Sequence, residues 1–379
     1  MRIGIEAQRI FRPKKHGMDM VALELIRNLQ RIDTENEYFI FVKPDTDCNV
    51  IHETDNFHIV KLKGGFYPFW EQVLLPRAAK KHHCDLLHCT SNTAPVFSTV
   101  PLMITLHDII YLEKLMLFGK AGSWYQKLGN VYRRWVVPPV VRKSRMVITV
   151  SDFERDRICR FFGLETDRLK TVYNGVSQHF RPISDPSELN RIKEKYMLPD
   201  RFFFFLGNTD PKKNTGGVIQ SFARFRTSSG EDFKLVMPDY PEDALSSLVK
   251  DLGCPEIRDH IHLTGYIVNT DLPGIINLSK LFLYPSLRES FGIPILEGMA
   301  CGIPVITSNT SSMPEIAGDA AFVIDPFQPQ QITDAIRQLL TSREMYEDYS
   351  RKGLKRSSFF SWENMARQVL NLYNSLSPK

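Results

Sequence analysis

Two glutamates, Glu289 and Glu297, stand eight positions apart in a segment whose residues fit a turn followed by a helix. The turn contains Gly292, and Pro294 suits the first turn of a helix, where its missing N–H would have no partner anyway. Glu297 lies one turn into this helix, where its carboxylate can accept two hydrogen bonds from a ribose diol. Glu289, in the turn, would lie beside a group attached to a bound phosphate. The alternative for each glutamate is an ordinary helix start, where the dipole favours acidic side chains.

The start of the same helix is also a potential anion site. An apolar run precedes the turn, so the chain passes from a buried strand to a helix through a short loop. Backbone N–H groups in the first turn of a helix have no partner inside it, and the helix dipole favours negative charge there. Here these groups belong to Phe291, Gly292 and Ile293. The pattern therefore predicts a ligand that carries phosphate.

The length and composition of the chain indicate the scaffold that must hold these residues. The 379 residues favour two domains, and 43% apolar with 24% charged residues exclude disordered, collagen-like and heptad-repeat proteins. No apolar run approaches the roughly 18 residues that a membrane-spanning helix needs. The first six residues alternate like a strand and lack the apolar core of a signal peptide, so we expect the chain to fold in the cytoplasm.

Short apolar runs alternate with helix-like stretches through most of the chain, a pattern typical of parallel sheets covered on both faces. In the first half, we expect strands at 2–6, 38–42, 86–89, 103–106, 146–150 and 169–172, and helices at 18–31, 69–82, 124–137 and 152–162. In the second half, we expect strands at 202–206, 234–237, 262–264, 281–284, 305–307 and 322–324. A boundary near 178–186 then gives two doubly wound domains, with ligands bound beyond the carboxyl ends of the strands.

Residues 285–304 resemble the signature of the retaining glycosyltransferases of family 4, in which seven residues separate two glutamates. The similarity, strongest to the mannosyltransferase-like branch, continues through 304–309, 314–315 and 318–321, and upstream through 105–108, 150–153, 173–176, 208–214, 265–266 and 271–272. It implies the α/β GT-B fold, with two Rossmann-like domains facing a central cleft. The expected domains are an acceptor-binding domain at 1–180 and a nucleotide-sugar domain at 181–360, with a helix at 361–379 that could cross back.

The resemblance implies that Lys213 neutralises the diphosphate as it leaves, while Glu289 holds hydroxyls of the sugar. Many members carry an arginine a few residues before this lysine, but the chain has Gly207, Asn208 and Thr209 there. Asn208, Lys212 or a base of the first domain could compensate. The implied donor-binding residues are Gly17, Asn208, Lys212, Lys213, Tyr266, Ile267, Glu289, Ser290, Phe291, Gly292, Ile293 and Glu297.

The first half of the chain differs from the family pattern at the glycine loop after the first strand, and it contributes a further candidate site residue. The family tends to have two or three glycines after the first strand, whereas this chain keeps only Gly17, with Asp19 close by. Asp19 would repel a phosphate unless it points away or faces the acceptor. His107 ends an apolar strand, and the resemblance places it near the transferred hexose as a third catalytic residue beside Glu289 and Lys213. Its alternative role is a core histidine bonded to a carbonyl, with Asp108 orienting it or capping the next turn.

The chain contains two patterns that resemble metal sites. Asp45, Thr46 and Asp47 form a D-x-D triplet, and His and Cys residues cluster at 82–89. We interpret the first as a turn and the second as a helix end followed by a buried strand, because no second ligand cluster follows at zinc spacing. The six cysteines lack the spacing of a disulfide framework. We expect no metal requirement and no resident cofactor.

The resemblance implies the transfer of a hexose with retention, most favourably mannose from GDP-mannose, to a hydroxyl of a glycan or lipid-linked acceptor in surface polysaccharide synthesis. The acceptor hydroxyl would attack on the face from which the diphosphate leaves. A retaining phosphorylase or trehalose-type synthase, and a non-catalytic sugar-nucleotide-binding protein, stay open as alternatives. No nucleic-acid partner is expected, and the sequence does not indicate an oligomeric state.

The charge of the chain is unevenly distributed. Residues 1–180 carry 26 basic and 19 acidic side chains, and residues 114–151 contain eight bases and no acid. This stretch includes Lys127, Arg133, Arg134 and Trp135, which we predict contact an acceptor or a membrane. It could dock on anionic headgroups at the inner membrane face, bind a pyrophosphate-linked lipid acceptor, or form a solvated basic helix face.

Overall fold

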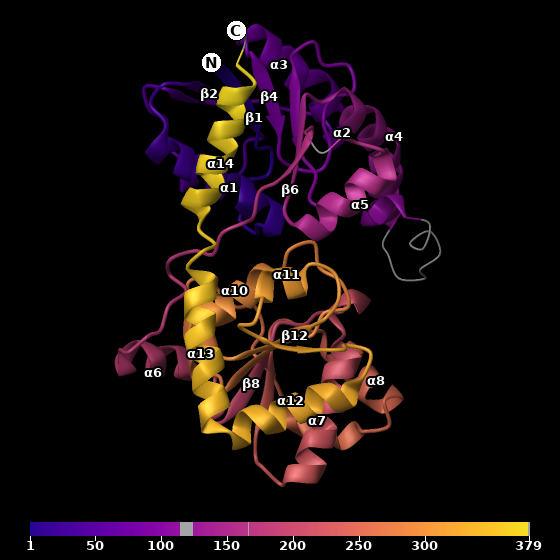
Figure 1. Ribbon diagram of the computed structural model, residues 1–379, viewed down its shortest axis with the longest axis vertical. Coiled ribbons are helices and arrows are strands. Elements are labelled where there is room, and N and C mark those ends of the chain that lie inside the picture. Colours follow the sequence, from indigo (N-terminus) through magenta and orange to yellow (C-terminus); the bar gives the residue numbers. More distant parts are fainter. Residues whose placement is uncertain (114–123, 166, 378–379) are drawn as a thin grey trace. The chain divides into compact units, whose positions relative to one another are not determined.

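The computed structural model describes residues 1–113, 124–165 and 167–377, without the side chains of residues 124–127. The chain forms two compact units, each with a parallel sheet covered by helices (Figure 1). Unit 1 comprises Met1–Gly175 and Trp362–Lys379, and unit 2 comprises Val176–Ser361. The chain thus enters unit 2 slightly earlier than the expected boundary at 180, and its last helix belongs to unit 1. The expected doubly wound α/β fold is confirmed for both units.

The described part of unit 1 contains a seven-stranded parallel sheet with the strand order β3-β2-β1-β4-β5-β6-β7. The chain turns to opposite sides of β1, so the sheet has a switch point between β1 and β4, where such folds bind ligands. The strands are β1 (Arg2–Glu6), β2 (Glu37–Val42), β3 (Phe57–Lys61), β4 (Leu86–Cys89), β5 (Leu102–Thr105), β6 (Met146–Thr149) and β7 (Leu169–Thr171).

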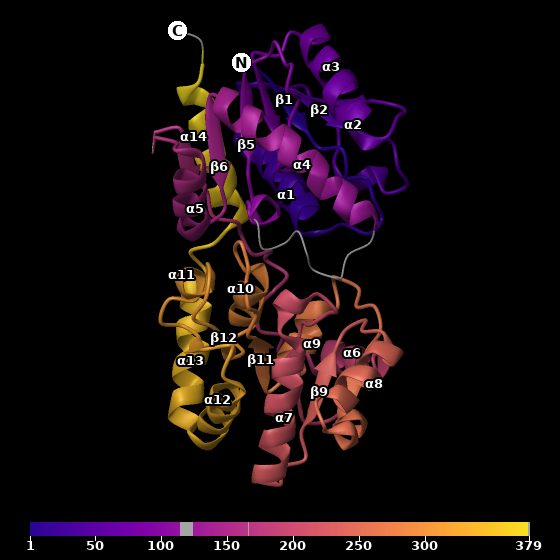
Figure 2. The same ribbon diagram turned by 90° about the vertical axis from the view of Figure 1, so that its right-hand side faces the viewer.

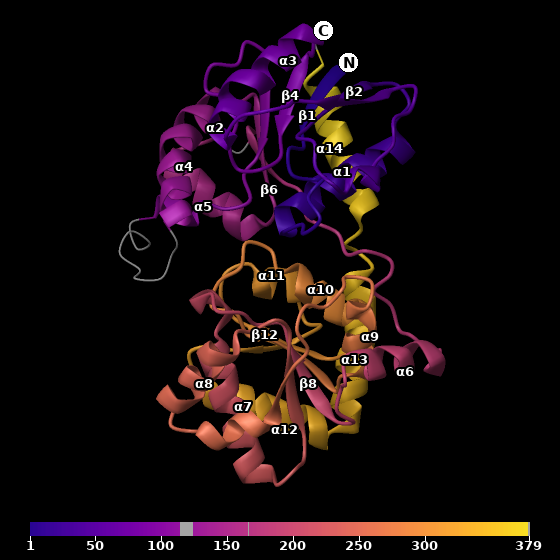
Figure 3. The same ribbon diagram turned by 180° about the vertical axis from the view of Figure 1, so that it is seen from behind.

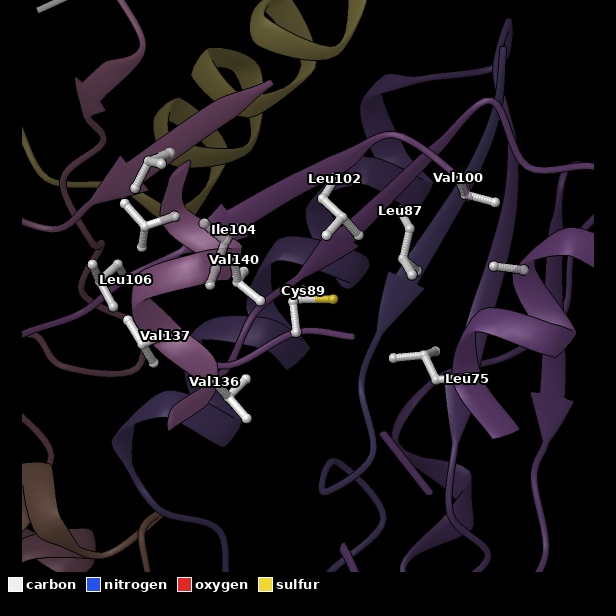
Figure 4. Packing of buried hydrophobic residues seen from close by; sticks show 14 of the residues in the cluster. Leu75, Leu87, Cys89, Val100, Leu102, Ile104, Leu106, Val136, Val137 and Val140 are labelled. Carbon is white, nitrogen blue, oxygen red and sulfur yellow. The ribbon is translucent and has the colours of Figure 1, made fainter. Parts of the chain in front are cut away.

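Helices cover both faces of this sheet (Figures 1 and 3). They are α1 (Gly17–Ile32), α2 (Tyr67–Phe69), α3 (Leu75–Lys81), α4 (Trp124–Lys143), α5 (Asp152–Phe162) and α14 (Trp362–Ser375). One core cluster joins α3, α4 and α5 to the sheet, and Figure 4 shows valines of α4 packed near Ile104 and Cys89. On the opposite face, α14 packs along α1. Helix α5 begins as its sequence predicts, because the Ser151 side chain accepts a hydrogen bond from the Glu154 N–H.

Three local differences from the expected elements have physical reasons. Strand β3 was not expected, because as the outer strand of the sheet it is only partly buried and lacks a continuous apolar run. The helix expected at 69–82 is divided into α2, a π-helical turn at Trp70–Leu74 and α3. Helix α4 continues past Pro138 and Pro139 to Lys143 (Figure 2). Each interior proline costs about 3 kcal/mol, which burial of the valines at 136, 137, 140 and 141 offsets.

The described part of unit 2 contains a six-stranded parallel sheet in the order β10-β9-β8-β11-β12-β13. The strands are β8 (Phe202–Phe205), β9 (Lys234–Met237), β10 (Ile261–Leu263), β11 (Leu281–Tyr284), β12 (Val305–Ser308) and β13 (Phe322–Ile324). Strand β8 pairs with β9 on one side and with β11 on the other, which places a second switch point between β8 and β11.

The helices of unit 2 also form two layers. One core cluster joins α7, α8 and α12 to the sheet, while α6 packs on α9 and α13 packs on α10. The helices are α6 (Pro186–Lys195), α7 (Thr215–Ser229), α8 (Glu242–Asp251), α9 (Leu272–Leu278), α10 (Ile293–Ala300), α11 (Met313–Ala317), α12 (Pro329–Thr341) and α13 (Arg343–Ser357). No helix in the described residues of either unit is long and apolar enough to cross a bilayer.

A buried hydrogen-bonded pair fixes α14 on unit 1. The Tyr373 hydroxyl lies 2.6 Å from Nδ1 of His88, and Nε2 of this histidine lies 2.8 Å from the Thr105 hydroxyl. Both rings are fully buried, and burial lowers the pKa of His88 to about 3. His88 is therefore neutral and shares its two ring nitrogens with α14 and β5.

We expect Tyr373→Ala to destabilise unit 1 by about 3 to 5 kcal/mol, because it opens a cavity and leaves His88 without its α14 partner. Tyr373→Phe keeps the ring and should cost about 1 to 2 kcal/mol. Urea denaturation followed by tryptophan fluorescence measures both values. Gln368→Ala, an exposed position of α14, is the control and should change stability by less than about 0.5 kcal/mol. Equal losses for all three variants would contradict this account.

Candidate functional site

Lys213 and Glu289 meet at the switch point of the unit 2 sheet. Lys213 follows β8 and Glu289 follows β11, and these strands are parallel neighbours whose carboxyl ends lie at the same edge. The Lys213 Nζ donates a hydrogen bond of 2.6 Å to Oε1 of Glu289. Their side chains are only 15% and 13% exposed, so the ion pair has little contact with water. The two main expected site residues thus contact each other directly.

A short 3-10 turn, Pro211–Lys213, presents the lysine. The Asp210 carboxylate accepts a hydrogen bond from the Lys212 N–H and so begins the turn. Asn214 follows in the left-handed conformation, with φ of 58°, which asparagine tolerates better than most residues. Its side-chain nitrogen donates to the carbonyls of Pro285 and Pro326 at 3.1 and 2.9 Å. Asn214 therefore ties the lysine turn to the loops after β11 and β13.

The loop that carries Glu289 is held by four hydroxyl side chains, which we call the hydroxyl clamp: Ser308, Thr310, Ser311 and Ser312. The hydroxyls of Ser308, Thr310 and Ser312 donate to the carbonyls of residues 286, 287, 289 and 291 at 2.6 to 3.0 Å, and the Ser312 hydroxyl is shared between the last two. The Glu289 N–H donates in turn to the Ser311 hydroxyl at 3.0 Å. Most polar backbone groups of the loop are thus satisfied before any ligand binds, which preorganises the loop.

Helix α10 begins immediately after this loop. Gly292 precedes it with φ of 98°, a conformation that favours glycine. The first-turn N–H groups have no partner inside the helix, as the sequence pattern indicates. Gly298 lets the helix approach the sheet, because a Cβ there would lie 2.5 Å from the Phe282 ring and 2.9 Å from Val305. Phe291 is buried and packs edge-on against Phe360.

Glu297 lies in the second turn of α10 and is half-buried. No group of the described residues donates a hydrogen bond to its carboxylate. Burial raises the pKa of Glu297 to about 7, so near neutral pH the free protein contains both the protonated and the ionised form. A partly buried carboxylate without a donor suits a ligand that brings hydroxyl groups.

The remaining expected donor-binding residues of unit 2 are more exposed. The Asn208 side-chain oxygen accepts a hydrogen bond from the Asp210 N–H, which leaves the amide nitrogen as a donor for a ligand. Lys212 lies 3.5 Å from the Asp210 carboxylate. Tyr266, 58% exposed, follows Gly265 in the loop after β10, and Ile267 comes next and is half-buried. Ser290 is half-buried in the loop held by the hydroxyl clamp.

In unit 1, His107 follows β5 at the carboxyl edge of the sheet and is only 5% exposed. Its Nε2 lies 3.0 Å from the Thr90 carbonyl, and burial lowers its pKa. Because a carbonyl only accepts, the neutral ring carries its proton on Nε2 and keeps Nδ1 as an acceptor. The histidine thus makes the carbonyl bond of its alternative role. Asp108 caps the next turn by accepting from the Ile110 N–H at 3.0 Å.

Gly17 and Asp19 lie at the start of α1. Gly17 is exposed, and a Cβ there would contact nothing in the described residues. Asp19 is buried and accepts a hydrogen bond of 3.0 Å from the His16 N–H, so its carboxylate turns back onto the start of its own helix. This contact gives Asp19 a structural role at the start of α1.

The expected acceptor or membrane residues lie on α4. Trp135 is 79% exposed. Arg134 is half-buried and donates to the Tyr111 carbonyl at 2.8 Å, while the Arg133 guanidinium lies 5.5 Å from the Tyr111 ring centroid. Both arginines therefore support the 110–113 turn in addition to any outward role. The side chain of Lys127 lies outside the described residues.

The two patterns that resemble metal sites have structural contacts. Asp47 pairs with Lys15, and the Asp45 carboxylate accepts from the Thr46 N–H at 2.7 Å, as in a turn. His88 bonds to Tyr373 and Thr105. Across the residues that the structure describes, no three His, Cys, Asp or Glu side chains lie together as a metal site requires. The six cysteines are free thiols. Independence from metal stays a prediction.

Sequence reasoning missed Tyr284, the last residue of β11. Its hydroxyl accepts a hydrogen bond of 2.8 Å from the Lys213 ammonium, whose nitrogen lies 4.8 Å from the ring centroid. The one available signal was a tyrosine at the carboxyl end of a strand, because ligand contacts gather at that edge. The hydroxyl clamp was missed as well, since a run of serines and threonines is equally typical of an ordinary loop.

Family comparisons match both halves of the chain. The family described as "Glycosyltransferase Family 4" matches residues 16–179, and the family described as "Glycosyl transferases group 1" matches residues 187–356. The first match lies mostly within unit 1, and the second lies within unit 2.

Among curated proteins, O-antigen chain mannosyltransferase B of Escherichia coli is 35% identical over 237 residues, which cover 62% of this chain and 61% of that protein. The serotype-specific mannosyltransferase WbdA of Escherichia coli is 28% identical over 240 residues, which cover 62% of this chain and 29% of that protein. The chain thus spans less than two thirds of the length of either relative.

Among solved structures, HepE of Anabaena in complex with UDP-glucose has a TM-score of 0.76 at 16% identity and covers 99% of this chain and 100% of that one. A glycosyltransferase from Rickettsia africae has a TM-score of 0.75 at 16% identity and covers 99% and 98%. These likenesses show the shared GT-B fold of two Rossmann-like domains. With a family match in each half, the chain belongs to the family 4, group 1 glycosyltransferases.

Proposed function

We propose that the chain transfers a hexose, mannose from GDP-mannose, with retention to a hydroxyl of a glycan or lipid-linked glycan acceptor in surface polysaccharide synthesis. The observation that carries the proposal is the constellation at the unit 2 switch point: a lysine and a glutamate in contact, and a second glutamate without a hydrogen-bond donor. The names of the mannosyltransferase relatives support mannose as the transferred sugar.

Each of the three side chains has a distinct task in this proposal. Glu297 accepts two hydrogen bonds from the ribose diol, which supplies the donors that its carboxylate lacks. Lys213 contacts the diphosphate, together with the first-turn N–H groups of α10. Glu289 exchanges Lys213 for hydroxyl groups of the sugar when the donor arrives. No metal takes part in this scheme, because the ammonium and the helix dipole supply the positive charge.

The transfer step balances without a protein nucleophile. The bond between the anomeric carbon and the diphosphate oxygen breaks, and the acceptor oxygen bonds to the same carbon from the same face. A phosphate oxygen of the departing diphosphate takes the hydroxyl proton. Lys213 stabilises the charge that develops on the diphosphate, and this differential stabilisation lowers the barrier. In unit 1, the ring of His107 keeps Nδ1 as a hydrogen-bond acceptor at the carboxyl edge of the sheet.

The outer face of α4 supports a peripheral membrane contact. Leu128, Val131 and Trp135 are 55%, 52% and 79% exposed, and their spacing of three and four places them on one side of the helix. Arg142 and Lys143 are exposed at its carboxyl end. Apolar side chains beside bases favour an anionic lipid surface, where the aromatic ring enters the interface and the bases contact headgroups.

A donor panel tests the proposed activity. At one hundred times its dissociation constant, GDP-mannose should stabilise unit 2 by about 2.7 kcal/mol, or roughly 5 to 10 °C in a thermal-shift assay, with smaller shifts for UDP- and ADP-sugars. Slow release of GDP without acceptor should accompany binding. A larger thermal shift with UDP-glucose would show that the proposed donor is wrong. Binding without turnover, even with acceptor extracts, would indicate a non-catalytic sugar-nucleotide-binding protein instead of a transferase.

Glu289→Ala separates binding from transfer. This variant should lose at least about a hundredfold in transfer rate while its affinity for GDP stays within a few fold, because the carboxylate contacts the sugar and not the nucleotide. Isothermal titration calorimetry and a radiolabelled-sugar transfer assay measure the two quantities. Glu344→Ala, an exposed glutamate of α13, is the matched control and should retain both. Persistent transfer by Glu289→Ala would contradict the assigned role.

The raised pKa of Glu297 predicts pH-dependent nucleotide binding. The ionised carboxylate is the better acceptor for ribose hydroxyls, so affinity should rise as pH rises through the pKa near 7. One pH unit below that pKa, about a tenth of the free protein is ionised, so GDP should bind roughly tenfold more weakly at pH 6 than at pH 8. Glu297→Gln, measured in parallel, removes this contribution and controls for ionisation of the nucleotide. Identical pH profiles for the two proteins would rule out the assignment.

Vesicle sedimentation tests the α4 contact. Wild type should bind vesicles rich in phosphatidylglycerol at low salt, and Trp135→Ser should weaken binding by roughly tenfold because it removes the exposed aromatic ring. Phe359→Ser removes an aromatic that is 61% exposed in unit 2 and is the control. If wild type does not bind anionic vesicles, or if both variants lose equally, the membrane contact is wrong and a soluble acceptor is favoured.

A further inference from the structure

Tyr284 stands out from the aromatic residues of the unit 2 sheet. The rings of Phe204, Phe282 and Tyr284 form a stack, with centroid separations of 5.6 and 6.3 Å and interplanar angles of 18°. The first two are phenylalanines inside the sheet, and the third lies where β11 ends. Packing alone needs only the ring, so the hydroxyl at this edge requires another explanation.

The tyrosine is held firmly in place. It is 2% exposed, and its strand pairs with β8 on one side and with β12 on the other. Its carbonyl accepts a hydrogen bond of 3.0 Å from the Thr307 hydroxyl. Backbone pairing and ring stacking together leave the hydroxyl in one position, which is the property that a fixed anchor needs.

The hydroxyl is directed at the charged pair. Lys213 donates to the Tyr284 oxygen at 2.8 Å and to Glu289 at 2.6 Å, so the ammonium lies between a fixed neutral group and a carboxylate on a loop. Burial and the nearby Glu289 hold the pKa of Tyr284 well above its usual value. The phenol therefore keeps its proton, and its oxygen accepts from the ammonium.

We infer that Tyr284 is a positioning residue that keeps the Lys213 ammonium at the diphosphate subsite while Glu289 is exchanged for the donor. The inference rests on the proposed function, in which the glutamate turns to the sugar. After that exchange, Lys213 has lost its contact with Glu289 but keeps its hydrogen bond to the Tyr284 hydroxyl. A long lysine side chain without this anchor would sample several rotamers and lose part of its electrostatic effect.

A double-mutant cycle tests the inference with two readouts. The cycle compares wild type with Tyr284→Phe, Lys213→Ala and the double variant. Calorimetry measures pyrophosphate binding, and a transfer assay measures kcat and KM for the sugar. Tyr284→Phe should weaken pyrophosphate binding and lower kcat by roughly tenfold or more, the usual effect of removing a hydrogen bond to a charged group. In the Lys213→Ala background, the same substitution should change neither quantity, because the tyrosine acts through the lysine.

Tyr346→Phe is the matched control. Its hydroxyl donates to the Lys280 carbonyl and its ring lies 4.1 Å from the Lys280 ammonium, so it loses a comparable contact elsewhere in unit 2. This variant should leave pyrophosphate binding and kcat unchanged. A loss in Tyr284→Phe that matches the control would indicate general destabilisation and overturn the inference.

The outcomes separate the inference from the proposed function. Coupling between Tyr284 and Lys213 in pyrophosphate binding, without any sugar transfer by wild type, would support the positioning role and reject the transferase activity. Robust transfer by wild type with additive effects of the two substitutions would overturn the positioning role and leave the activity intact. Failure of wild type to bind pyrophosphate would also overturn the inference.

Discussion

The parallel pairing of β8 with β11 is the constraint on which the site depends. Lys213 and Glu289 are 76 positions apart in the sequence, yet they lie within hydrogen-bonding distance because their strands end at one edge. In a doubly wound sheet, the chain leaves the two strands at a switch point toward opposite faces, which opens space between the following loops. The buried phenylalanines of both strands keep this edge rigid.

The ion pair gives the donor-free site its electrostatic character. A lysine and a glutamate that are both mostly buried neutralise each other, and each satisfies a charge that would otherwise be costly to desolvate. A ligand with negative phosphates and neutral hydroxyls can replace both contacts at once, phosphate for the lysine and hydroxyls for the glutamate. In the proposed function, recognition of such a ligand therefore includes an exchange of partners, and this exchange favours ligands that contain both kinds of group.

Several features could be predicted from the sequence because they depend on local patterns. Short apolar runs indicated most strands, and the spacing of Glu289 and Glu297 with Pro294 indicated the turn and α10. Other features depend on distant packing. Helix α4 continues through two prolines because valines on its inner face are buried against the sheet. A rule that considers only neighbouring residues predicts that the helix ends before these prolines. The contact of Tyr284 with Lys213 requires the strand pairing, which a periodic pattern does not specify.

The hydroxyl clamp has a consequence for how the site could diversify. The carbonyls of the loop that carries Glu289 are held by Ser308, Thr310 and Ser312, which belong to the end of the next strand and the turn that follows it. Several carbonyls along the path of this backbone are thus held by side chains from outside the loop. Substitutions within the loop can then alter which ligand groups it contacts while the hydroxyl clamp keeps the backbone on its course.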